Sequence, residues 1–196
     1  MALRNFLFTA LFVSALPTFA AALNYTSGCT SGEAGLTSTI DFGPTGTPNT
    51  TDPAGHATYA LFDFSSQSPG CGGSWLNQAS GTTIITFNAP ISYFGFAWAS
   101  TDTYNIVRVF NGSTLLNSFS GNAGGASAAT VYANIFAGVG EQITKIEMVS
   151  NGCCFETDNH SYILATESSA VPEPSSLLLV LAAAVVAPFA RRKFAR

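Results

Sequence analysis

The chain has 196 residues, of which 47% are hydrophobic and only 9% are charged, a length that accommodates one domain with short terminal signals rather than two domains. The positive charges lie mostly at the two ends, because residues 23–170 contain only Arg108 and Lys145 against ten Asp and Glu, a formal net charge of -8. So acidic a segment cannot neutralise a row of phosphates, which argues against nucleic-acid binding and favours cations or neutral glycans as partners.

Residues 1–22 have the three parts of a secretory signal peptide. Arg4 makes the start basic, residues 6–16 are apolar, and Ala20 and Ala22 place small residues at -3 and -1 of a cleavage after Ala22. The apolar run is shorter than the roughly 20 residues of a spanning helix, which argues against a permanent anchor. We predict a signal peptide helix at 1–22, export by the Sec machinery, cleavage by signal peptidase and a mature start at Leu23.

Residues 23–170 alternate short β-branched and aromatic runs with turn-forming residues, and no long stretch has a 3.6-residue apolar period. Asn111 and Gly112 predict a tight hairpin turn, whereas the Gly- and Pro-rich segments predict loops. Loops are predicted at 43–55, 65–73 and 120–129, and strands at 37–42, 56–64, 82–87, 91–99, 104–110, 114–119, 130–136, 142–149 and 160–166. This spacing without helices predicts an all-β fold with a single β-sandwich at 23–170.

Four cysteines lie in the predicted exported part, where an oxidising compartment permits disulfides. Cys29, Cys71, Cys153 and Cys154 allow three connectivities. Adjacent cysteines rarely bridge each other without strain, so the favoured scheme joins Cys29 and Cys71 each to one of the Cys153–Cys154 pair. Zinc is the weaker alternative, because paired Cys-x-x-Cys spacing is missing.

Polar residues between 156 and 159 are the predicted metal site. Glu156, Asp158 and Asn159 supply three hard oxygen ligands within four residues, a set typical of calcium-binding loops. Asp102 and Asn105 form a second polar cluster. The alternative is that Asp158 and Asn159 cap a turn by hydrogen bonding to nearby backbone amides.

Trp75 and Trp98 are the predicted glycan contacts, since aromatic rings offer flat apolar faces with a polar edge. Trp98 ends the aromatic run at 93–98, and Trp75 lies in a Gly-rich segment beside Cys71. The alternative is that alternate members of the aromatic run form the core and that Trp75 covers its edge. Catalytic motifs such as Gly-x-Ser-x-Gly and a phosphate-binding loop are missing from the sequence, so we predict no catalytic residue and no enzymatic activity.

The C-terminal tail has three parts in a fixed order: the peptide Val171-Pro172-Glu173-Pro174, an apolar segment at 175–190, and the cations Arg191, Arg192, Lys193 and Arg196. This order closely resembles the PEP-CTERM sorting signal of exopolysaccharide-producing Gram-negative bacteria. The resemblance implies that exosortase, a membrane protease, recognises residues 171–196 and cleaves close to the motif.

Physical chemistry agrees with that resemblance. Two prolines keep the backbone extended and free of helical hydrogen bonds, as a protease substrate requires. The basic end should stay cytoplasmic while the short apolar helix crosses the inner membrane transiently. The alternative, a buried helix of the globular domain, fits four cations after the segment less well.

A second resemblance covers roughly residues 82–162. The peptides Tyr93-Phe94-Gly95-Phe96-Ala97-Trp98, Asp102-Thr103-Tyr104-Asn105 and Phe155-Glu156-Thr157-Asp158-Asn159 look like those of exosortase-dependent surface proteins with a jelly-roll-like ectodomain. Ala99 replaces the glycine usual after the tryptophan. The resemblance brings no catalytic residue.

Together these features predict an exported, non-catalytic protein of the cell surface or extracellular matrix, associated with exopolysaccharide. The alternative is a carbohydrate-binding, lectin-like module that depends on calcium.

Overall fold

The computed structural model describes residues 20–43, 51–60, 64–65, 71, 75–78, 80–99, 101–121, 130–152 and 154–166. The predicted signal peptide, apart from its last three residues, and the whole predicted sorting tail lie outside these ranges. The chain divides after Leu164 into two units, and all the described strands belong to the first.

The described residues form an all-β structure, which confirms the predicted fold class. The eleven strands are β1 (Ala22–Ser27), β2 (Ser38–Ile40), β3 (Ala57–Ala60), β4 (Phe64–Ser65), β5 (Trp75–Gln78), β6 (Gly81–Trp98), β7 (Asn105–Asn111), β8 (Thr114–Ser120), β9 (Val131–Phe136), β10 (Ile143–Ser150) and β11 (Phe155–Leu164). Within the described ranges no helix is long and apolar enough to cross a membrane.

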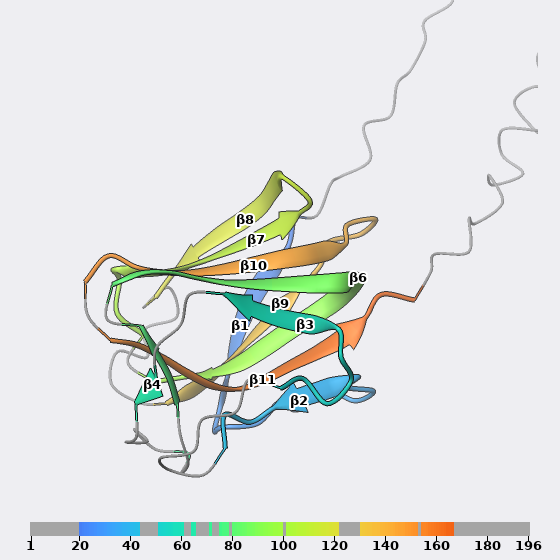
Figure 1. The fold of residues 1–196 in the computed structure, drawn as a ribbon. Coiled ribbons are helices and arrows are strands. Elements are labelled where there is room, and N and C mark those ends of the chain that lie inside the picture. Colours follow the sequence, from blue (N-terminus) through green and yellow to red (C-terminus); the bar gives the residue numbers. More distant parts are fainter. Residues whose placement is uncertain are drawn as a thin grey trace, which may run out of the picture. The chain divides into compact units, whose positions relative to one another are not determined.

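The long strand β6 holds the sheet together. Its first half pairs with β10 and β3, and its second half, from Ile91 onward, pairs with β9 and β11. The main path is β4-β5-β11-β6-β10-β7-β8, while β1 extends β9 and β2 pairs with β11, all antiparallel. One continuous sheet therefore bends at β6, and Figure 1 shows its two halves facing each other, with β3, β10, β7 and β8 on one side and β1, β9, β11 and β2 on the other.

The main core lies between the two halves and follows the alternation of the strands. Phe94, Phe96 and Trp98 point inward from β6, where they meet Val107 and Val109 of β7 and residues of the other strands. Trp98 stacks on Phe155 of β11 with ring centroids 4.9 Å apart. Burying such large rings supplies much of the hydrophobic free energy of a domain this size.

The predicted strands at 82–87 and 91–99 are one strand in the structure. Asn88, Ala89 and Pro90 looked like a break because proline cannot donate a ladder hydrogen bond. They lie where β6 passes from one set of neighbours to the other, and the pairing with β10 shifts register there. A residue without an N–H is tolerated at such an irregularity, so the strand continues.

The predicted hairpin is present as β7 and β8. Asn111 is the last residue of β7 and pairs with Thr114, so the two-residue loop is Gly112 and Ser113. Gly112 has a φ of 56°, which a glycine adopts without a steric cost. The turn therefore depends on glycine at its first central position, and Asn111 does not share the positive φ.

Candidate functional site

A second, smaller apolar cluster lies on the outer face of the sheet, opposite the main core. Alternation along β6 places Ala97 and Ala99 on this face, where they pack with Trp75 of β5 and Tyr132 of β9. Cys29 and Cys71 pack against the same cluster. The outer face of this half of the sheet is therefore covered by chain segments instead of being open to solvent.

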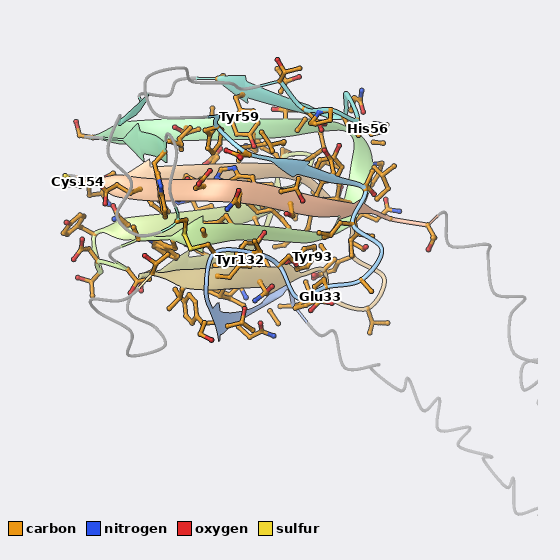
Figure 2. All side chains as sticks on the ribbon, turned by 90° about the horizontal axis from the view of Figure 1, so that it is seen from below. Glu33, His56, Tyr59, Tyr93, Tyr132 and Cys154 are labelled. Atoms are coloured by element: carbon orange, nitrogen blue, oxygen red, sulfur yellow. A yellow bond between two sulfur atoms is a disulfide. The ribbon has the colours of Figure 1, made fainter. Side chains whose placement is uncertain are left out.

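Gly95 makes room for two tyrosines on that face. A Cβ atom at Gly95 would overlap the hydroxyl of Tyr93, and it would lie 2.6 Å from the ring of Tyr132. Figure 2 shows these two tyrosines next to each other. The Gly95 of the aromatic run is thus needed because two rings cross its backbone closely.

The tyrosine hydroxyls belong to a hydrogen-bonded network. Tyr93 donates to Asn134 Oδ1 at 2.8 Å, and Ser31 lies 2.7 Å from the same hydroxyl oxygen, to which it donates because Tyr93 has a single hydroxyl hydrogen. Tyr132 donates to the carbonyl oxygen of Asn159 at 2.8 Å. Burial raises the pKa of both tyrosines, so both stay neutral donors.

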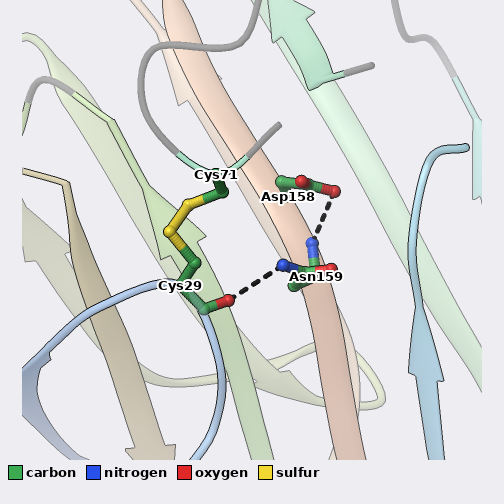
Figure 3. The surroundings of a disulfide bond; sticks show 4 residues. All are labelled: Cys29, Cys71, Asp158 and Asn159. Atoms are coloured by element: carbon green, nitrogen blue, oxygen red, sulfur yellow. Dashed lines mark hydrogen bonds between the residues drawn. A yellow bond between two sulfur atoms is a disulfide. The ribbon is translucent and has the colours of Figure 1, made fainter. Parts of the chain in front are cut away.

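Cys29 and Cys71 are bonded to each other, with Cα atoms 5.6 Å apart (Figure 3). The favoured scheme, in which each joined the Cys153–Cys154 pair, is therefore wrong. The sequence argument failed because Cys71 and Cys29 lie in segments that fold over the same outer face, a proximity that spacing along the chain does not reveal. Cys154 is also disulfide-bonded, and Cys153 lies outside the described residues.

Both tryptophans predicted to contact glycans are fully buried. Trp75 has 0% exposure in the outer cluster, beneath the disulfide, and Trp98 has 0% exposure in the main core. The Nε1 of Trp98 has no hydrogen-bond partner among the described residues, so the ring is held in the core by its apolar contacts alone. Neither ring is presented to a ligand, so this prediction is corrected and the core alternative holds.

The three predicted calcium ligands lie within strand β11, not in a loop. Asp158 is buried and accepts a hydrogen bond from the backbone N–H of Asn159 at 2.7 Å. Asn159 has a φ of 49° and donates through Nδ2 to the carbonyl oxygen of Cys29 at 2.9 Å (Figure 3). Only Asp158 thus forms the local backbone bond of the capping alternative, here at a bulge in a strand, whereas the Asn159 side chain bonds to a segment distant in the sequence.

The described residues contain no group of three or more His, Cys, Asp or Glu side chains that could hold a metal ion. Glu156 is half-buried and takes part in interactions of its own. Burial raises the pKa of the Asp158 carboxyl to about 6, although the backbone amides of Asn159 and Phe42 lower it in part. The site therefore favours a carboxyl that bonds internally, and calcium binding here stays a prediction.

His160 is a fully buried, neutral histidine. Thr157 donates to the sulfur of Met148, so its hydroxyl oxygen accepts from His160 Nε2 at 2.9 Å, which leaves Nδ1 to accept from the Tyr59 hydroxyl at 2.9 Å. Phe42 packs edge-on against the imidazole at 4.9 Å. Burial lowers the pKa of His160 to about 3, so this ring is an internal connector between β3 and β11.

Asp52 fastens the segment before β3 to the rest of the domain. Its two carboxylate oxygens accept hydrogen bonds from the hydroxyls of Ser38 and Tyr162 and from the backbone N–H groups of Ala54, His56 and Ala57. Burial raises the pKa of Asp52, but these donors outweigh it and lower the pKa to about 2. Asp52 was not singled out in the sequence, where only the following proline marked it as a turn residue.

Among the described residues, Tyr104 is an aromatic residue exposed to solvent, at 36% exposure. Its hydroxyl donates to Asp102 at 2.7 Å, and its ring lies against Gly152, where a Cβ would lie 3.0 Å from the ring. The hydrogen bond to Asp102 raises the pKa of Tyr104. The ring of Tyr104 therefore presents an aromatic face to solvent, which neither buried tryptophan does.

Comparison with known proteins identifies the tail. Residues 170–196 match the family described as the PEP-CTERM protein-sorting motif. These residues are a PEP-CTERM sorting signal. No curated protein matches the chain. The PEP-CTERM signal implies export, processing by exosortase and localisation at the cell surface, whereas the described β-domain has to be interpreted from its own residues.

Proposed function

We propose that this PEP-CTERM protein is a non-catalytic component of the cell surface or extracellular matrix, associated with exopolysaccharide. The observation that carries the proposal is the sorting signal at 170–196, which follows closely on an acidic all-β domain with an internal disulfide. In this proposal the domain is a jelly-roll-like sandwich, residues 1–22 are a signal peptide, and the segment at 175–190 crosses the inner membrane until exosortase cleaves.

The use of the buried polar groups supports a structural role. Asp52, Asp158 and His160 each hold a backbone segment or a neighbouring strand through internal hydrogen bonds. A general acid or base must reach a substrate proton, and these three groups are oriented toward the protein itself. The domain is therefore built for rigidity in an oxidising environment.

The sorting part is tested by the C-terminal mass of the protein recovered from the surface of a host with exosortase. Cleavage near Val171 is expected, and the basic tail should be lost. The matched control is the same host without exosortase, where the tail should remain. Recovery of intact Arg196 from the surface of the exosortase-containing host would contradict the proposal.

Carbohydrate binding is the second candidate, and the exposed Tyr104 beside Asp102 favours it. A glycan array probed with the processed protein separates the two roles. Saturable binding that Tyr104→Ala abolishes, and that the control Leu115→Ala at another exposed position leaves unchanged, supports a lectin-like module. A blank array supports the structural role. Repeating the array and a thermal melt with a chelator tests calcium dependence, and an unchanged result excludes it.

A further inference from the structure

Ala21, the residue directly before β1, is part of the folded core. It is 1% exposed and belongs to the main core between the two halves of the sheet. The inward side chains continue in order along the strand with Leu23 and Tyr25, which pack on the same core, while Ala22 and Asn24 are exposed. Ala21 is thus the first inward residue of β1, according to the two-residue alternation of a strand.

The backbone of Ala21 is also bonded to a distant part of the chain. Asn117 of β8 donates from Nδ2 to the Ala21 carbonyl oxygen at 2.7 Å. The bond joins the start of β1 to the edge strand β8. Ala22 continues the ladder by pairing with Phe136 of β9.

A mature chain that began at Leu23 would lose these features together. The buried Ala21 methyl group and the first pair of the β1–β9 ladder would be removed, and the Asn117 amide would lose its acceptor. A buried or half-buried donor left without a partner is costly.

A cleavage site two residues earlier keeps the buried Ala21 methyl group, the pair of Ala22 with Phe136 and the acceptor of the Asn117 amide. Thr18 and Ala20 provide small residues at -3 and -1 of the bond between Ala20 and Ala21. We propose that signal peptidase cuts this bond, so that the mature protein begins at Ala21 and keeps the whole of β1. The inference rests on the export proposed above.

The test is the N-terminal sequence and mass of the full chain after expression in an exporting bacterium. A product that begins at Ala21 is expected. A product that begins at Leu23 overturns the inference while leaving the export route intact. A surface product that still carries Met1 overturns both the cleavage site and the proposed signal peptide, so the two failures are distinguishable.

Two matched variants of the full chain locate the cleavage independently. Ala22→Phe places a large residue at -1 of the later site, and Ala22 is exposed in β1, so the fold can accept the ring. This variant should be processed as fast as the wild type and begin at Ala21. Thr18→Phe blocks -3 of the earlier site and should lose the Ala21 product. The opposite pattern, in which Ala22→Phe stops processing and Thr18→Phe does not change it, overturns the inference.

Discussion

Two buried side chains of β11 should oppose each other in the pH dependence of stability between pH 7 and pH 5. Burial lowers the pKa of His160 to about 3 from an ordinary 6.5, and burial raises the pKa of Asp158 to about 6 from an ordinary 3.8. Below pH 6.5 His160 becomes protonated in the unfolded chain but stays neutral in the folded chain, which destabilises the folded state. Below about pH 6 the folded chain binds a proton on Asp158 that the unfolded chain still lacks, which stabilises it.

The size of each effect follows from proton linkage. Between pH 7 and pH 5, His160 should lower the free energy of unfolding by about 2 kcal/mol, and Asp158 should raise it by about 1 kcal/mol. His160→Gln removes the first titration, so this variant should be about 1 kcal/mol more stable at pH 5 than at pH 7. Asp158→Asn removes the second and should be about 2 kcal/mol less stable at pH 5 than at pH 7.

The assay is urea unfolding of each processed protein at both pH values. Comparing the two pH values within one variant cancels the constant cost of the substitution. Equal pH dependence in wild type, His160→Gln and Asp158→Asn would refute the reasoning. Should His160→Gln fail to fold, the His160 ring in the wild type can be followed by NMR, where it should remain neutral at pH 5.

Three further substitutions test other contacts through thermal and urea unfolding. Asp52→Asn should lower the free energy of unfolding by about 1 to 2 kcal/mol at pH 7. The difference from wild type should become smaller as the pH falls from 3.8 toward 2, because the wild-type carboxylate is protonated over this range. A difference that does not change with pH would contradict this explanation. Gly95→Ala should cost about 1 to 3 kcal/mol through overpacking, whereas the control Gly32→Ala, with no atom near its Cβ, should stay within about 0.5 kcal/mol of wild type. The double substitution Cys29→Ser with Cys71→Ser should lower the free energy of unfolding by about 3 to 4 kcal/mol, since the disulfide spans 42 residues. An unchanged melting temperature would show that this disulfide does not constrain the unfolded chain.

The sequence predicted the all-β class because alternation and turn residues are local signals. It failed where a backbone irregularity changes the meaning of a local pattern. Residues 156–159 looked like a polar loop, yet the positive φ of Asn159 inserts a bulge that lets Phe155 and Thr157 before it, and His160 after it, all face inward. The order of polar and apolar side chains does not predict this change in which residues face inward.

The prediction of glycan contacts at Trp75 and Trp98 failed for a different reason. A tryptophan in a sequence is expected either to be buried or to bind a ligand. Residue type alone does not indicate which face of a sheet is covered by other parts of the chain. Trp75 is buried on the outer face because the segments that carry Cys29 and Cys71 lie over it. That outer cluster depends on contacts between segments far apart in the chain, so the disulfide beside it could not be derived from spacing.

The position of β11 has a consequence for the timing of export. It is the last of the described strands, and it pairs with β6, β5 and β2. In the export route proposed above, a chain that crosses the membrane with its N-terminus first would complete this sheet only after Leu164 had emerged. The sorting signal begins at residue 170, so in the proposed route completion of the sheet and recognition of the tail would both come at the end of one translocation.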